Sequence, residues 1–213
     1  KEYDGTPLTN ASVEVSGDGF ALNEGAEYTI EASRTLTGIS ENAFTYILNE
    51  NTSLDNYNIT KVYGSLTVVN RNHRYEITVT ANQGTFLYDG QVHTVSGLEE
   101  TSFLIEGKTY TVEGLQAEAS ATDAGTYPVM ITGTPVVKDE EGNDVSDQFA
   151  VYSENGTMTI TPRNIRLVSA SETREYDGTP LTNAEVVVLG EGFAENESAV
   201  YEVTGRQVIT GTS

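Results

Sequence analysis

The sequence predicts a mainly β protein made of small, elongated β-domains in tandem. Nearly every apolar stretch of the 213-residue chain alternates with polar residues at period two, which places one strand face on a core and the other in water. Glycines recur between these stretches and supply positive φ angles at turns. The string Tyr-Asp-Gly-Thr-Pro-Leu-Thr-Asn-Ala occurs at residues 3–11 and again at 176–184, which indicates internal repetition.

The expected strands are rich in β-branched and aromatic residues, which suit a pleated surface. No segment carries a sustained helical period, and the one Ala-rich stretch, residues 118–124, is short. In chain order, the alternating apolar positions are Val13 and Val15, Leu66 and Val68, Tyr75, Ile77 and Val79, Tyr110 and Val112, Tyr127, Val129 and Ile131, Met158 and Ile160, and Ile165 and Leu167.

The internal repeat divides the chain into three parts. Residues 1–40 and 174–213 align without a gap at an offset of 173 and share 23 of 40 residues, and a weaker copy starts at Tyr88. This repetition favours an extended structural protein over a closed enzyme domain. The expected parts are a Tyr-Asp-Gly repeat lacking its first strand at 1–70, a sister repeat at 71–162, and the first half of a further Tyr-Asp-Gly repeat at 163–213.

The two junctions between these parts are short. Residues 70–74 and 162–164 are neither Gly/Ser-rich nor long enough to behave as a flexible coil, so we expect stiff connections. Basic residues gather there, and two interpretations are open. They form salt bridges to carboxylates of the neighbouring repeat, or they solvate strand ends, where an exposed pair contributes about 0–1 kcal/mol. These basic residues are Arg71, Arg74, Arg163 and Arg166, with His73 beside them.

The Tyr-Asp-Gly turn is the most regular motif. Gly accepts a positive φ, Asp hydrogen-bonds to nearby backbone N–H groups, and the tyrosine anchors the turn to a core. An exposed adhesive loop is the alternative, but recurrence in every repeat favours a structural corner. The three turns are Tyr3, Asp4 and Gly5, then Tyr88, Asp89 and Gly90, and then Tyr176, Asp177 and Gly178.

A second motif bears on the fold. Residues 123–127 read Asp-Ala-Gly-Thr-Tyr, the Asp-x-Gly-x-Tyr arrangement in which an immunoglobulin-like domain bonds the tyrosine hydroxyl back to the backbone of the corner. The equivalent residues 42–46 keep the tyrosine but lack the Asp and Gly. The pattern favours an immunoglobulin-like sandwich, and a β-grasp-like sheet is the alternative because periodicity does not separate the two.

An acidic stretch around a glycine is the strongest candidate for a metal site. Oxygen ligands beside a Gly turn suit Ca²⁺, although the spacing differs from that of an EF-hand loop. The alternative is a solvated hairpin following Val136 and Val137. The candidate calcium ligands are Asp139, Glu141, Asn143, Asp144 and Asp147; no other cofactor is expected.

Composition excludes several functions. With a net charge of −21 and only 11 basic residues, the chain is unsuited to binding nucleic acid or an anionic membrane, and no apolar run approaches a membrane span. Cysteine is absent, so neither disulfides nor thiolate metal sites form. Two histidines, no nucleophile elbow and no phosphate-binding loop argue against an enzyme. No lysine recurs at one repeat position, so we do not expect isopeptide crosslinks.

These residues resemble a known family. The openings at 1–9 and 174–182, with the segments 56–60 and 64–68, are similar to the Tyr-Asp-Gly-type ("MBG/YDG") repeats of bacterial surface proteins. The central copy departs from the pattern, because Gln-Val-His at 91–93 replaces Thr-Pro-Leu. The resemblance implies long, extracellular, cell-wall-attached adhesin-like proteins of mostly Gram-positive bacteria, in which such modules are stalks without catalytic residues.

Three functions follow as hypotheses. The first is a structural stalk that holds a terminal binding domain away from the cell, with neighbouring repeats as its partners and a host glycan or protein bound by another domain. The second is a β-module that itself binds a glycan or host protein. The third is a subunit of an extracellular fibre in which an edge strand of one chain completes the domain of another.

Overall fold

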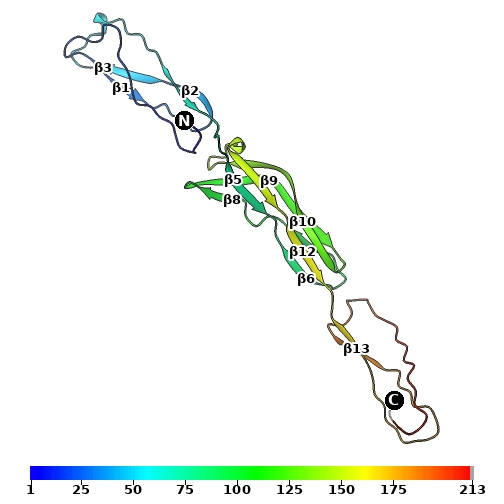
Figure 1. Cartoon of the computed structure of the whole chain (residues 1–213). Coiled ribbons are helices and arrows are strands. Elements are labelled where there is room, and N and C mark those ends of the chain that lie inside the picture. The colour runs from blue at the N-terminus through cyan, green and yellow to red at the C-terminus, as the bar shows by residue number, and fades with distance from the viewer. Residues whose placement is uncertain (212–213) are drawn as a thin grey trace. The chain divides into compact units, whose positions relative to one another are not determined.

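The computed structural model describes residues 1–211, and within them the protein is mainly β, as predicted (Figure 1). The tandem arrangement and the choice between a sandwich and a β-grasp-like sheet stay predictions. Fourteen strands and two short 3-10 turns, Leu54–Asn56 and Ser146–Gln148, form its regular structure. None of these residues lies in an α-helix, and most of the Ala-rich stretch belongs to strand β9 (Lys108–Ala121).

Contacts divide the chain into two compact units, each built from three segments. Unit 1 comprises Lys1–Thr78, Glu100–Gly114 and Thr134–Tyr152, and unit 2 comprises Val79–Glu99, Leu115–Gly133 and Ser153–Ser213. The division runs through β9 and β10 (Gly125–Lys138), whereas the sequence repeat places breaks near residues 70 and 162. Those repeat boundaries stay a prediction, and residues 212–213 of the third predicted part lie outside the described residues.

The first 70 residues of unit 1 contain two antiparallel strand pairs. Strand β1 (Ala26–Ile30) pairs with β3 (Phe44–Leu48), and β2 (Gly38–Asn42) pairs with β4 (Gly64–Val68). The predicted alternation is confirmed in β4, because Leu66 and Val68 are buried. These two side chains and Tyr3 are the fully buried apolar residues of this part.

The strand expected at Val13 and Val15 is not present. Residues 11–16 form no strand, whereas the equivalent residues of the later copy form β14 (Val186–Gly190), which pairs with β13 (Ile165–Ser169). No strand of the described residues pairs with residues 11–16, and alternation alone does not fix the backbone.

The rest of unit 1 packs around a small aromatic and aliphatic core. Strand β5 (Tyr75–Thr80) neighbours β11 (Phe149–Glu154), and β8 (Ser102–Ile105) pairs with the start of β9. The predicted alternation is confirmed in β5, because Ile77 and Val79 are buried. The core side chains are Ile77, Tyr110, Val112, Val137, Val145 and Phe149.

Unit 2 contains the other ends of these long strands. The sheet has the order β6-β12-β10-β9-β7, in which β6 (Gly84–Leu87) and β12 (Gly156–Thr161) pair in parallel and β7 (His93–Ser96) is antiparallel to β9. Tyr127 donates its hydroxyl to the carbonyl oxygen of Asp123 at 2.9 Å, so the predicted tyrosine-corner bond is confirmed. The buried core is Ala81, Val95, Ala117, Val129, Met158 and Ile160.

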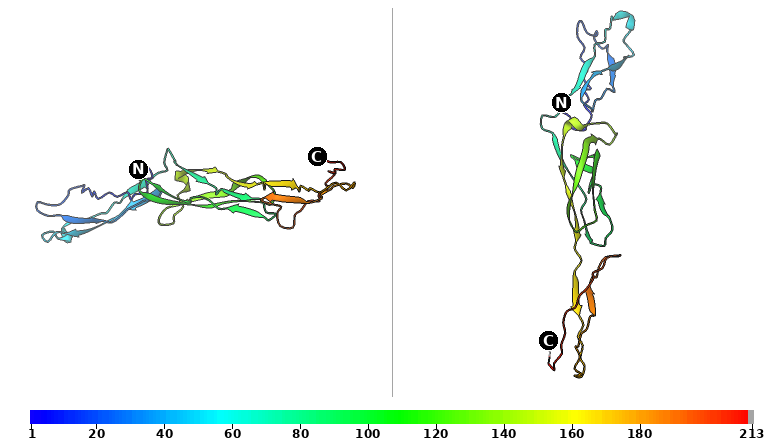
Figure 2. Two further views of the ribbon diagram at one scale, coloured as in Figure 1. Left: turned by 90° about the horizontal axis from the view of Figure 1, so that it is seen from below. Right: turned by 90° about the vertical axis from the view of Figure 1, so that its right-hand side faces the viewer.

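The pair of β13 with β14, yellow and orange in Figure 2, differs from the prediction in which of its faces is covered. Ile165 and Leu167 were expected on a core face, but they are 36% and 50% exposed, and Val168 on the opposite face is the half-buried residue. A two-stranded pair has no second layer over this face. Alternation identifies two faces, and the neighbouring elements decide which one is buried.

Candidate functional site

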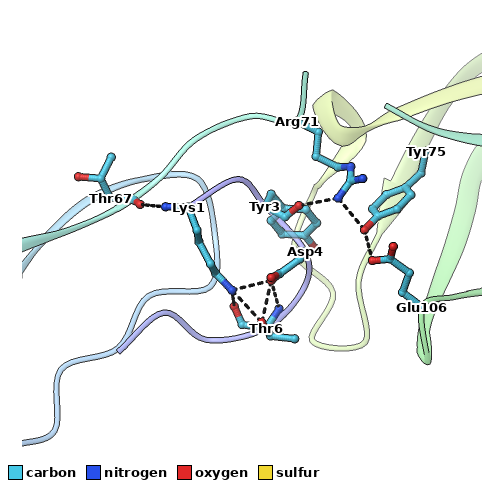
Figure 3. Close-up of polar contacts among 8 residues, drawn as sticks. All are labelled: Lys1, Tyr3, Asp4, Thr6, Thr67, Arg71, Tyr75 and Glu106. Atoms are coloured by element: carbon cyan, nitrogen blue, oxygen red, sulfur yellow. Dashed lines mark hydrogen bonds and ion pairs between the residues drawn. The ribbon is translucent and has the colours of Figure 1, made fainter. Parts of the chain in front are cut away.

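The first Tyr-Asp-Gly turn is closed by its aspartate. Asp4 Oδ1 accepts the Thr6 N–H at 2.9 Å and the Thr6 hydroxyl at 2.7 Å, and Gly5 has φ = 73°. Lys1 Nζ donates to the same Asp4 oxygen at 2.6 Å and to the Thr6 carbonyl at 2.8 Å (Figure 3). Gly is required because this φ is unfavourable for residues with a Cβ.

The Asp4 carboxyl is held ionised by these contacts. Desolvation opposes ionisation, but the hydrogen bonds from Lys1 and Thr6 together outweigh it and lower the pKa of Asp4 to about 2. The chain start is also fixed, because the Tyr3 N–H donates to the Val69 carbonyl at 2.9 Å and the terminal amine of Lys1 donates to the Thr67 carbonyl at 3.0 Å. The turn therefore lies beside the end of β4.

The other two turns repeat this geometry with substitutions. Asp177 accepts the Thr179 N–H at 2.9 Å and the Thr179 hydroxyl at 2.7 Å, and Arg174 takes the place of Lys1. Asp89 accepts the Gln91 N–H at 2.9 Å and contacts His93 Nε2 at 2.9 Å. The glycines of both turns have φ = 80°. All three aspartates thus cap their own turns.

The tyrosines of the three turns differ in burial. Tyr3 is 1% exposed, and burial together with the neighbouring Tyr110 hydroxyl raises the pKa of Tyr3 far above its ordinary range. Its hydroxyl has no hydrogen-bond partner, although Tyr110 lies beside it. Tyr88 is half-buried and donates to a Glu197 carboxylate oxygen, and Tyr176 is 68% exposed.

Arg71 connects the first turn to the strand that follows it. Its Nη1 donates to the Tyr3 carbonyl oxygen at 3.0 Å and to the Tyr75 hydroxyl at 2.8 Å (Figure 3). Its Nε donates to the His73 carbonyl at 3.0 Å. The guanidinium carbon also lies 3.8 Å from the centroid of the Tyr75 ring, a cation–π contact. One side chain thereby holds the turn and the start of β5 together.

Tyr75 and Gln148 complete this arrangement. Tyr75 donates its hydroxyl to Glu106, and burial followed by this hydrogen bond raises the pKa of Tyr75 to about 12. Gln148 is buried, and its Oε1 accepts the Arg71 N–H at 3.0 Å while its Nε2 donates to Asn70 Oδ1 at 2.8 Å. We call Arg71, Tyr75 and Gln148, together with the Tyr3 turn, the Arg71 joint.

Arg163 occupies the same place in unit 2. It follows the last strand, β12, and its Nη1 donates to the carbonyl oxygen of Tyr88 at 3.2 Å. Its Nε donates to the Gly192 carbonyl at 2.8 Å, and Nη2 donates to the Glu191 carbonyl. Both arginines therefore bind the carbonyl of the tyrosine in the preceding Tyr-Asp-Gly turn. We call this second arrangement the Arg163 joint.

The salt-bridge interpretation of these basic residues is wrong. The ion pairs found within residues 1–211 are Lys1 with Asp4, His93 with Asp89, and Arg174 with Asp177, and none involves a junction arginine. Arg71 and Arg163 donate to backbone carbonyls and a tyrosine hydroxyl instead. A planar guanidinium with five donors suits several carbonyl acceptors at once, which explains this choice of partner.

The acidic hairpin uses its oxygens within the loop. Asp139 Oδ1 accepts the N–H groups of Glu141 at 3.1 Å and Asn143 at 2.7 Å, and Asp144 Oδ1 accepts the Ser146 N–H at 3.0 Å. Among the residues that the structure describes, no three His, Cys, Asp or Glu side chains gather as a metal site. Of the candidate calcium ligands, Asp139 and Asn143 contact each other through their side chains, and calcium binding at this hairpin stays a prediction.

A cavity of about 250 Å³ lies between the first turn and this hairpin in unit 1. Tyr3 and Tyr110 line it together with Asp139 and Lys108. Two of its three acidic residues accept backbone N–H groups, because the Thr109 N–H donates to Glu140 at 2.9 Å and the Asn143 N–H donates to Asp139 at 2.7 Å.

Comparison with known proteins adds no family to this description. The sequence matches no protein-family model, and no curated protein or solved structure matches it. The resemblance to Tyr-Asp-Gly-type repeats therefore stays a prediction. Within residues 1–211, no helix has the length and apolar character to cross a membrane.

Proposed function

We propose that this chain is a structural stalk, a set of spacer repeats that hold a binding domain away from a bacterial cell surface. The observation that supports the proposal best is the pair of arginine joints. Arg71 and Arg163 follow the last strand of successive repeats, and each fastens the preceding Tyr-Asp-Gly turn to residues further along the chain. A spacer needs such fastening, because a flexible connection would let the repeats fold back.

The joints resist bending through directional contacts. A hydrogen bond to a charged group contributes roughly 1.5–3 kcal/mol, and a cation–π contact adds about 0.5–2 kcal/mol. The Arg71 joint has both kinds, and buried Gln148 fixes the backbone of Arg71 itself. Because these contacts fix the angle at the junction, the joint stiffens the chain without a long linker.

Location and partners belong to the same proposal. A net charge of −21 keeps repeats of like sign apart and suits an exported protein, and the absence of cysteine means that the cores alone stabilise it. We place the chain outside the cell, attached to the surface or cell wall, with neighbouring repeats as its direct partners. Asp139 and Glu140, which line the cavity beside the first turn, already accept backbone N–H groups, which favours a spacer over a ligand-binding module.

Small-angle scattering tests the stalk. We expect an extended profile for the intact chain, and a broader range of dimensions for the double variant Arg71→Ala/Arg163→Ala. The matched control is Arg74→Ala, since Arg74 is exposed and near the same junction. A compact profile for the unchanged chain contradicts the proposal, as does a double variant that scatters like the control.

A further inference from the structure

The Tyr176 turn is exposed although its sequence equals that of the covered Tyr3 turn. Tyr3 is 1% exposed and Tyr176 is 68% exposed. The surroundings of the two glycines differ in the same way. A Cβ built on Gly5 would lie 2.7 Å from the Tyr110 hydroxyl oxygen, whereas one on Gly178 meets nothing within 4 Å. One copy of the turn is thus packed against other residues, and the other is not.

The two turns have the same local structure, so the difference in exposure has another cause. Thr6 and Thr179 bond to their aspartates at the same distances. The flanking bridges also correspond, because Leu8 pairs with Arg34 and Leu181 pairs with Gln207 at the repeat offset. The exposed turn is therefore already folded into the shape that is covered elsewhere.

The cover of the first turn comes from residues 71–152. Arg71 binds the Tyr3 carbonyl, the Tyr110 hydroxyl lies beside that of Tyr3 and close to Gly5, and the Tyr110 ring contacts that of Phe149 at a centroid distance of 4.8 Å. The side chain of Asn72 donates to Glu2. Residues 174–182 repeat residues 1–9 except that Arg174 replaces Lys1, so Glu175 corresponds to Glu2.

We infer that the Tyr176 turn is a docking surface for a second copy of the segment 71–152. In this arrangement the Arg71 of that copy binds the Tyr176 carbonyl, its Tyr110 covers the Tyr176 ring, and its Asn72 meets Glu175. The central turn follows the same rule with another cover, because Tyr88 bonds to Glu197 and a Cβ on Gly90 would lie 3.7 Å from that of Ala194. The inference rests on the proposed function, since it treats the turn as a repeated joint.

An extended protein with engineered cysteines tests the docking. Ser213 aligns with Ser40, so residues 41–162 joined after Ser213 keep the repeat register and add a second copy of the segment. The chain has no cysteine. A disulfide between E175C and N72C of the added copy therefore reports the contact of Glu175 with that Asn72. The reference is E2C combined with N72C in the original copy, where the two side chains are hydrogen-bonded.

We expect the E175C pair to form a disulfide to the same extent as the reference pair, and to lose it when Tyr176→Ala removes the ring. A reference pair that crosslinks while the E175C pair does not overturns the inference. Disulfide-linked dimers of the unextended E175C chain also overturn it, because they show that another copy of the turn is the occupant. If the E175C pair forms its disulfide in a protein whose small-angle scattering shows a compact particle, the docking inference holds and the stalk proposal is contradicted.

Discussion

At the scale of single residues, Arg71 makes the contacts that hold the first turn to the start of β5. Its guanidinium binds one carbonyl of the first turn, one carbonyl of its own loop and the Tyr75 hydroxyl, and it covers the Tyr75 ring. The sequence places basic residues at the junctions but does not indicate their acceptors, so carboxylates were the wrong expectation. The sequence does not indicate which backbone carbonyl accepts such a hydrogen bond, since every residue has one.

Replacing Arg71 should destabilise unit 1. We expect Arg71→Ala to lower the free energy of unfolding by about 2 kcal/mol, because hydrogen bonds from a charged donor and a cation–π contact are lost. Arg71→Lys should recover only part of this, since an ammonium lacks the planar fork. Urea unfolding followed by tyrosine fluorescence measures both, with Arg74→Ala as the control. Equal stability of Arg71→Ala and the control contradicts the joint.

Tyr75 makes stability depend on alkaline pH. Its pKa is raised to about 12, against about 10 in an unfolded chain, so the folded state favours the protonated phenol. This contribution is complete below pH 10 and is lost as the pH rises from about 10 through 12. We expect unfolding free energy to fall across that window, and to fall less steeply in Tyr75→Phe. Tyr152→Phe, at an exposed tyrosine, should follow the unchanged protein; identical slopes in all three proteins refute the assignment.

At the scale of elements, the sequence predicted strands best where both ladder partners lie within the described chain. The alternation of Ile77 and Val79 agrees with their burial in β5, and that of Met158 and Ile160 agrees with their burial in β12. The failures are residues 11–16, which lack a partner strand, and β13, whose apolar face is uncovered. Both depend on long-range neighbours, which period-two alternation does not encode.

Gly156 shows how closely elements approach in unit 2. It begins β12 and is buried, and a Cβ there would lie 2.1 Å from the Asn82 carbonyl oxygen and 2.7 Å from that of Ala81. We expect Gly156→Ala to destabilise the protein by about 1–3 kcal/mol, because the backbone has to move to admit the methyl group. Gly205→Ala is the control, since a Cβ there meets nothing within 4 Å. Thermal melting compares them, and equal melting temperatures count against this packing.

The acidic hairpin should fold without calcium. Asp139 and Asp144 already cap backbone N–H groups, and the pKa of Asp144 is lowered first by the Ser146 hydroxyl. We therefore expect the same melting temperature in calcium and in EDTA, and a loss of stability in Asp139→Asn under both conditions. A melting temperature that rises with calcium concentration would restore the metal hypothesis, because a ligand bound to the folded state stabilises it.

At the scale of the whole molecule, the candidate site was predictable only in part. The turns at Tyr3, Tyr88 and Tyr176 follow from repetition and the Asp-Gly pair, and the structure gives all three the same capping bonds. The role of Gln148 was not predictable, because it lies 77 residues from Arg71 in sequence and nothing local marks it. Recurrence of an arginine after each last strand, at 71 and 163, is the signal that points to a joint.

The most direct test of the stiff joint is a distance measurement across it. Spin labels on E50C and E113C, two exposed positions of unit 1 on either side of Arg71, give a distance distribution by pulsed electron paramagnetic resonance. We expect one narrow distribution in the protein with native Arg71, and a broad one after Arg71→Ala. A distribution that is already broad with Arg71 present, or that stays narrow without it, would contradict the central role of this arginine.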